Sequence, residues 1–189
     1  MKIGLFFGSF NPMHIGHKII ASYMAEFSGL DKIMFVVSPQ NPLKKPQSLL
    51  DQKHRLKIIK MEVEENPKLQ VSDIEFSMPQ PSYTIDTLIR LKEQYPENEY
   101  TLIMGADNFQ NFYKWKNYKK ILENYSMYVF PRPGFKITEN HENVHIVKDV
   151  AEMDVSASFI RDSIKKGGDV SSLMTEKAWK YTNDMNFYK

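Results

Sequence analysis

The sequence of 189 residues contains no cysteine. This absence excludes disulfides, thiolate catalysis and cysteine-based zinc sites, and it fits a reducing compartment, so we expect a cytoplasmic protein. No apolar run approaches the roughly 18 residues of a membrane helix, so we expect neither a signal peptide nor a membrane partner. The formal net charge is only +2, too small to predict nucleic acid as a partner.

The composition is typical of a folded domain. Hydrophobic residues make up 42% of the chain and charged residues 25%, without low-complexity tracts. A chain of this length buries a substantial core without disulfide or metal staples. We therefore expect a single domain over residues 1–189 with a helical C-terminal part from about residue 155. Both a monomer and a homo-oligomer are compatible with these patterns.

Alternating strand and helix patterns predict an α/β fold. Residues 3–8 and 32–37 are short apolar runs separated by a helical pattern, which is the signature of a right-handed β-α-β unit. Further elements are expected as strands at 69–76, 100–104, 127–130 and 144–147, and as helices at 52–65, 84–95, 156–166 and 171–188. The expected product is a doubly wound, mainly parallel sheet with helices on both faces and a site at the carboxyl ends of its strands.

Small residues and two histidines follow the first expected strand. Residues 8–17 read Gly-Ser-Phe-Asn-Pro-Met-His-Ile-Gly-His. A strand that enters a helix through such a turn aims backbone N–H groups at one point, which suits a phosphate. His14 and His17 would share one face of the first helical turn and could stabilise charge on a phosphoryl group. Two histidines alone would fit a solvated helix end equally well.

A second candidate phosphate site lies near the C-terminus. Residues 155–161 read Val-Ser-Ala-Ser-Phe-Ile-Arg, in which Ser156 or Ser158 can cap a helix. Ser158 and Arg161 are three residues apart, so the hydroxyl, the guanidinium and the backbone amides of that helix start would converge.

Other strings have two open interpretations. Residues 82–88, Ser-Tyr-Thr-Ile-Asp-Thr-Leu, fit an ordinary helix start capped by Ser82 or Thr84. Lys44 lies in a proline-flanked loop and is either solvated or a phosphate contact. Trp115 either packs or stacks on a ligand ring. His54 and Arg55, in the expected helix at 52–65, fit surface positions.

Taken together, these strings resemble the bacterial nicotinate-nucleotide adenylyltransferases of the nucleotidyltransferase superfamily, through five motifs in the family's order. Gly105 and Asp107, with Trp115 and Arg132 after them, match further family positions. The chain departs from the pattern in places. Phe7 stands where the family usually has a glycine, serine and asparagine replace threonine and aspartate at 9 and 11, and alanine and serine replace serine and threonine at 157 and 158.

The resemblance implies adenylyl transfer from ATP to nicotinate mononucleotide, giving deamido-NAD and pyrophosphate. It also implies Mg²⁺ bridging ATP oxygens with few protein ligands. Backbone amides around Thr84 would hold the nicotinate carboxylate, and a helix start does favour an anionic carboxylate over a neutral carboxamide. The alternatives are another acceptor, such as nicotinamide mononucleotide or phosphopantetheine, and a nucleotide-binding module without catalysis.

The resemblance also assigns residues to roles. The catalytic residues are His14, His17 and Arg161. The ATP-binding residues are Gly8, Ser9, Phe10, His14, His17, Gly105, Asp107, Ser158, Phe159 and Arg161. The residues for nicotinate mononucleotide are Ser9, Lys44, Tyr83, Thr84, Trp115 and Arg132. No side chain is assigned as a metal ligand.

Overall fold

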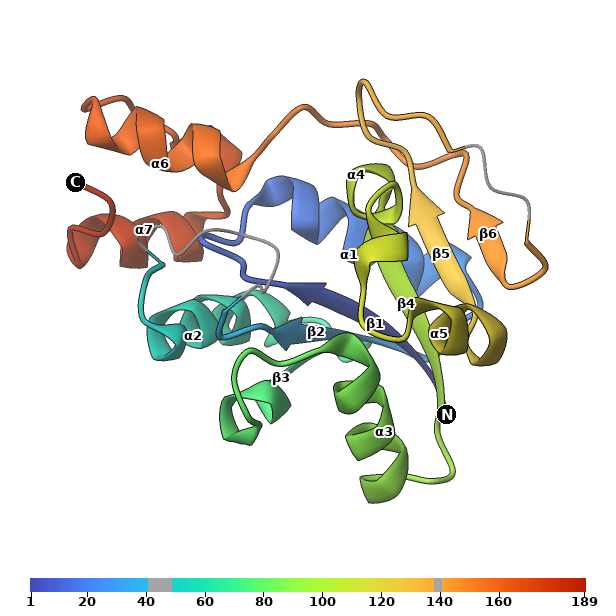
Figure 1. Ribbon diagram of the computed structural model, residues 1–189. Coiled ribbons are helices and arrows are strands. Elements are labelled where there is room, and N and C mark those ends of the chain that lie inside the picture. Colours follow the sequence, from blue (N-terminus) through green and yellow to red (C-terminus); the bar gives the residue numbers. More distant parts are fainter. Residues whose placement is uncertain (41–48, 138–140) are drawn as a thin grey trace.

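The computed structural model describes residues 1–40, 49–137 and 141–189. Its centre is a six-stranded sheet with the strand order β3-β2-β1-β4-β5-β6, in which every neighbouring pair is parallel (Figure 1). The strands are β1 (Lys2–Gly8), β2 (Lys32–Val37), β3 (Leu69–Ser72), β4 (Glu99–Gly105), β5 (Met127–Phe130) and β6 (Val144–Ile146). The order reverses at β1, which pairs with β2 on one side and β4 on the other. The carboxyl ends of β1 and β4 therefore flank the crevice where ligands bind in such sheets.

Helices cover both faces of the sheet, which confirms the doubly wound α/β prediction (Figure 1). One face packs against α1 (Ile15–Phe27), α2 (Gln52–Val63), α6 (Ala157–Lys165) and α7 (Glu176–Asp184). The other packs against α3 (Thr84–Gln94), α4 (Ala106–Phe109) and α5 (Tyr118–Asn124). Short 3₁₀ turns complete the fold: η1 (Ile74–Ser77), η2 (Phe112–Lys114) and η3 (Ser171–Leu173).

The apolar run of β1 is continuous because both of its faces are buried. Phe6 belongs to the core beneath α1 and α2, whereas Ile3 and Leu5 belong to the core beneath α3. These three side chains are at most 6% exposed. Full burial of one such side chain contributes roughly 1.5–3 kcal/mol, so the strand that carries the site is firmly held on both sides.

Two expected elements differ from the structure. The third strand was predicted to reach residue 76, but it ends at Ser72, whose Oγ accepts from the backbone N–H of Ile74 at 3.2 Å; the chain then turns into η1. The last helix was predicted over residues 171–188. It is instead η3 followed by α7, because Thr175 caps a new helix by accepting from the N–H of Ala178.

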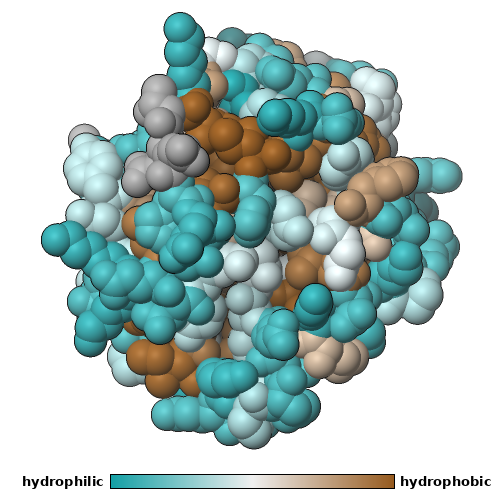
Figure 2. Space-filling view, turned by 90° about the vertical axis from the view of Figure 1, so that its right-hand side faces the viewer, coloured by the Kyte–Doolittle hydropathy of each residue, from teal (hydrophilic) through white to brown (hydrophobic). Residues whose placement is uncertain are grey.

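Among the described residues, β6 is an edge strand that pairs with β5 alone. Its Ile146 is 43% exposed. Figure 2 views the molecule from this side and shows hydrophobic areas separated by hydrophilic side chains. Within the described ranges, no helix combines the length and the apolar character needed to cross a membrane.

Candidate active site

The loop after β1 is built around Phe10. Phe10 has a φ of +46°, a left-handed conformation, and its ring is only 3% exposed. The ring lies beneath Gly8, where a Cβ would come within 2.9 Å of it, so Gly8 is needed for this close approach. It also contacts the ring of His17 at a centroid distance of 5.1 Å. The ring of Phe10 thus belongs to the core. At this position only the backbone of the loop is left to contact a ligand.

Arg55 of α2 holds this loop from below. A surface position, which the sequence allowed for Arg55, is wrong, because this residue is 1% exposed. Its guanidinium donates to the carbonyl oxygens of Ser9, Ser38 (2.8 Å), Pro39 (3.0 Å) and Leu50 (2.9 Å). Burial lowers the pKa of Arg55. One cation thus ties the loops after β1 and β2 together at the carboxyl edge of the sheet.

The two histidines face each other at the start of α1. His14 occupies the N-cap position, and its backbone N–H donates to Nδ1 of His17 at 3.2 Å. Their ring centroids are 3.7 Å apart, with planes inclined by 30°. Gly16 leaves room for this pair, since a Cβ there would lie 3.1 Å from Nδ1 of His14.

The electrostatic state of the pair follows from burial. Burial lowers the pKa of His14 to about 4, and the positive charge of Arg132 adds to the effect. His14 is therefore neutral near pH 7. His17 accepts through Nδ1, so in this arrangement its Nε2 is the nitrogen that can donate. A neutral imidazole donates one hydrogen bond, and both rings can then act as single donors.

The helix α6 brings the second predicted phosphate site to the same loop. Arg161 donates to the carbonyl oxygen of Asn11 at 2.7 Å and to Oγ of Ser158 at 3.2 Å. Ser156 caps the helix by accepting from the N–H of Phe159 at 3.2 Å, as the sequence predicted. Phe159 itself is 58% exposed. Two segments separated by 150 positions therefore meet at the carboxyl end of β1.

Asp107 and Arg132 lie beside each other at the ends of β4 and β5. Nε of Arg132 is 3.9 Å from Oδ1 of Asp107, and its Nη1 donates to the carbonyl of Met153 at 3.3 Å. Gly105 leaves space for both side chains, because a Cβ there would clash with Asp107 and approach Arg132. The positive charge of Arg132 also lowers the pKa of His14. Arg132 and Asp107 therefore act on the part of the crevice that holds the two histidines.

The helix start expected to bind the acceptor differs in its capping. Tyr83 occupies the N-cap position of α3, and no side chain caps the helix. The prediction that Ser82 or Thr84 caps it was wrong, because Oγ of Ser82 donates instead to the buried carboxylate of Glu75 at 2.7 Å. Sequence reasoning missed Glu75, which reads as one polar position in an expected strand.

Tyr83 and Trp115 are half-buried against the same core. Lys116, a further residue missed from the sequence, pairs with Asp86 at 2.9 Å and lies 4.8 Å from the centre of the Tyr83 ring. The ring of Trp115 meets Phe112 edge-on at 5.4 Å. Lys44 lies outside the described residues. Within those ranges, no three His, Asp or Glu side chains form a group that could hold a metal ion.

The chain is similar to known nucleotidyltransferases along its length. The cytidylyltransferase-like family model matches residues 5–163. A probable nicotinate-nucleotide adenylyltransferase of Flavobacterium johnsoniae is 49% identical, with both chains fully covered. One of Bacteroides fragilis is 41% identical over 95% of this chain and 90% of its own.

The fold also has a solved counterpart. The Plasmodium falciparum nicotinic acid mononucleotide adenylyltransferase, solved with NaAD, superposes with a TM-score of 0.84 over 99% of this chain and 97% of its own, at 19% identity. At that identity the likeness shows the fold alone. The relatives at 41–49% identity, which cover nearly the whole chain, also show the family. This chain belongs to the nicotinate-nucleotide adenylyltransferase family.

Proposed function

We propose that this enzyme transfers the adenylyl group of ATP to nicotinate mononucleotide, giving deamido-NAD and pyrophosphate. The observation that carries the proposal is the meeting of two anion-binding segments at the reversal point of the sheet. The histidine pair of α1 and the Ser158–Arg161 end of α6 converge on the loop after β1. The relatives' names supply the acceptor.

The reaction is a direct displacement. A phosphate oxygen of the mononucleotide attacks the α-phosphorus of ATP, and the bond from that phosphorus to the bridging oxygen breaks as pyrophosphate leaves. No nucleophilic side chain is required, so positioning and charge stabilisation account for catalysis. His14 and His17 donate to the transferring phosphoryl group, and Arg161 with Ser158 holds the β- and γ-phosphates. The backbone of residues 8–10, with Gly105, Asp107 and Phe159, completes the ATP site.

The acceptor binds on the α3 side of the crevice. The uncapped amides at Tyr83 and Thr84 receive the nicotinate carboxylate, because the positive end of a helix favours an anion. Trp115 stacks on the pyridine ring, and Ser9 and Arg132 contact the ribose phosphate. Lys44, which the sequence assigns to the same substrate, lies outside the described residues. The predicted location of the enzyme is the cytoplasm.

The described side chains fit a Mg²⁺ ion held mainly by the ATP phosphates and water. Asp107 is the one carboxylate assigned to the ATP site, and it already faces Arg132 at 3.9 Å. When bound, the ion neutralises charge on the phosphate oxygens. Arg161 and the histidines orient the phosphates around it without serving as its ligands.

Pyrophosphate release from ATP and Mg²⁺ tests the proposal. Parallel reactions would contain nicotinate mononucleotide, nicotinamide mononucleotide or phosphopantetheine. We expect release mainly with nicotinate mononucleotide. Release with another acceptor would refute the acceptor assignment while leaving the phosphate sites standing, and ATP binding without release in any reaction would point to a module without catalysis.

A further inference from the structure

Glu75 is a buried carboxylate beside the acceptor end of the site. It lies in η1 and is 2% exposed. Its Oε2 accepts from Oγ of Ser82 at 2.7 Å, and its Oε1 accepts from Oγ1 of Thr87 at 2.8 Å. Within the described residues, hydroxyl groups rather than cations hold this carboxylate. Burying a charged group is costly unless it is well bonded, so a carboxylate in this place needs a reason.

The two donors of Glu75 flank the first turn of α3. Ser82 precedes the N-cap residue Tyr83, and Thr87 lies one turn into the helix. The neighbouring loop is fixed as well, because Nε2 of Gln80 donates to the carbonyls of Glu75 at 2.9 Å and Met78 at 3.1 Å. The start of α3 is therefore attached to η1 through side chains on both sides of Tyr83 and Thr84.

The direction of these bonds matters for the helix start. A serine or threonine at the N-cap position ordinarily takes up one of the free N–H groups of a helix, but in α3 that position is occupied by Tyr83. Glu75 can only accept hydrogen bonds, so it draws the hydroxyls of Ser82 and Thr87 toward itself. The first turn of α3 has no side-chain cap, and the two bonds to Glu75 fix this turn with its amides available to an anionic ligand.

We propose that Glu75 is a positioning residue for acceptor recognition, which holds the uncapped amides at Tyr83 and Thr84 oriented toward the nicotinate carboxylate. The inference rests on the proposed function and deepens it. Glu75 does not touch the substrate. It acts through Ser82 and Thr87, so its loss affects the acceptor and not ATP.

The test measures KM for both substrates in Glu75→Gln. The amide keeps the shape of the side chain but offers one acceptor oxygen in place of two, so one of the two hydroxyl bonds that hold the start of α3 is lost. We expect the KM for nicotinate mononucleotide to rise about tenfold, the scale of one lost charge-assisted hydrogen bond. The KM for ATP should stay unchanged, and the preference for nicotinate over nicotinamide mononucleotide should fall.

Two variants of Thr87 separate positioning from packing. Thr87→Val keeps the side-chain shape and removes the hydroxyl, so it should raise the acceptor KM in the same way. Thr87→Ser keeps the hydroxyl and should restore the wild-type acceptor KM, even though it loses a buried methyl group.

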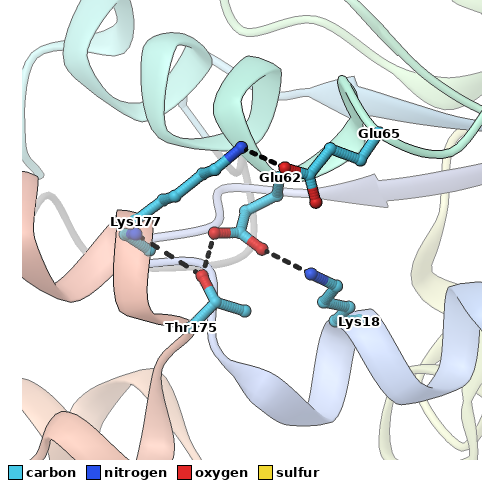
Figure 3. Close-up of polar contacts among 6 residues, drawn as sticks. Lys18, Glu62, Glu65, Thr175 and Lys177 are labelled. Atoms are coloured by element: carbon cyan, nitrogen blue, oxygen red, sulfur yellow. Dashed lines mark hydrogen bonds and ion pairs between the residues drawn. The ribbon is translucent and has the colours of Figure 1, made fainter.

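Glu62 provides the matched control (Figure 3). It is also a buried glutamate, 5% exposed, and accepts from the hydroxyl of Thr175, but it pairs with Lys18 at 3.2 Å and joins α1, α2 and α7. Glu62→Gln should lower the free energy of unfolding without a selective rise in the acceptor KM. The inference is overturned if Glu75→Gln changes both KM values equally or neither. Wild-type failure with nicotinate mononucleotide would instead refute the proposed function.

Discussion

The rings of His14 and His17 lie 3.7 Å apart, and the backbone of the first donates to Nδ1 of the second. This arrangement sets which nitrogen of His17 carries the proton, and burial keeps His14 neutral near pH 7. The pair thus offers two hydrogen-bond donors at the end of β1, next to the backbone amides of α1.

Replacing His17 by alanine should remove a donor to the transferring phosphoryl group. Loss of one such donor typically costs about 10²–10³-fold in kcat. We expect a loss of this size in His17→Ala, with a circular dichroism spectrum and unfolding midpoint close to wild type. Near wild-type turnover in a folded variant would show that His17 has no part in the chemistry.

The buried His14 makes stability depend on pH. Its pKa is about 4 in the folded chain and about 6.5 when unfolded, so the unfolded state binds more protons between these values. Stability should therefore be full above pH 6.5 and fall as the pH drops toward 4, by about 3 kcal/mol from this residue. Urea unfolding of wild type and His14→Asn at pH 7 and pH 4.5 checks this. An equal loss in both proteins would contradict it.

Arg55 should be among the most sensitive positions in the chain. Arg55→Leu leaves the partly buried carbonyls of Ser9, Ser38 and Pro39 without their donor. We expect the free energy of unfolding to fall on the order of 3 kcal/mol, and ATP affinity to fall with it. Chemical denaturation and ATP titration measure both quantities. A change within about 0.5 kcal/mol, typical of a surface site, would refute this account of Arg55.

Tyr188 contacts the loop after β1 through Asn11, from which it is separated by 177 positions in the sequence. Its hydroxyl donates to Oδ1 of Asn11 at 2.8 Å, and burial raises the pKa of the phenol, so it keeps its proton. Tyr188→Phe should cost about 1 kcal/mol of stability and raise the KM for ATP.

The matched control for Tyr188 is Tyr181→Phe. It removes a bond of the same length, to Nδ1 of His54, away from the loop. The stability cost should be similar and the KM for ATP unchanged. Equal KM values for ATP in the two variants would mean that Tyr188 only stabilises the packing of the C-terminal segment.

Local signals in the sequence predicted the sheet and most of its helices well, whereas the phosphate-binding roles stay predictions. Strand and helix periods and the serine cap of α6 depend on neighbouring residues. Each is therefore readable from a short window. The contact of Arg161 with the backbone of Asn11 lies at the edge where the topology gathers the ends of the parallel strands.

Side chains that bond across the chain could not be read in this way. Arg55 and Glu62 are seven residues apart on the buried side of α2, where charged residues contradict the apolar stripe. That contradiction was the available signal for Arg55. Glu75 and Tyr188 gave none, because their partners lie on other elements and only the fold brings them together.

The most direct test of the central claim is a competition between acceptors. The enzyme would receive ATP labelled at the α-phosphate and equal amounts of nicotinate and nicotinamide mononucleotide, and the labelled dinucleotides would be separated and counted. The uncapped start of α3 predicts deamido-NAD as the dominant labelled product, with one pyrophosphate released for each. Labelled NAD in equal or greater amount, or pyrophosphate without a labelled dinucleotide, would contradict the account.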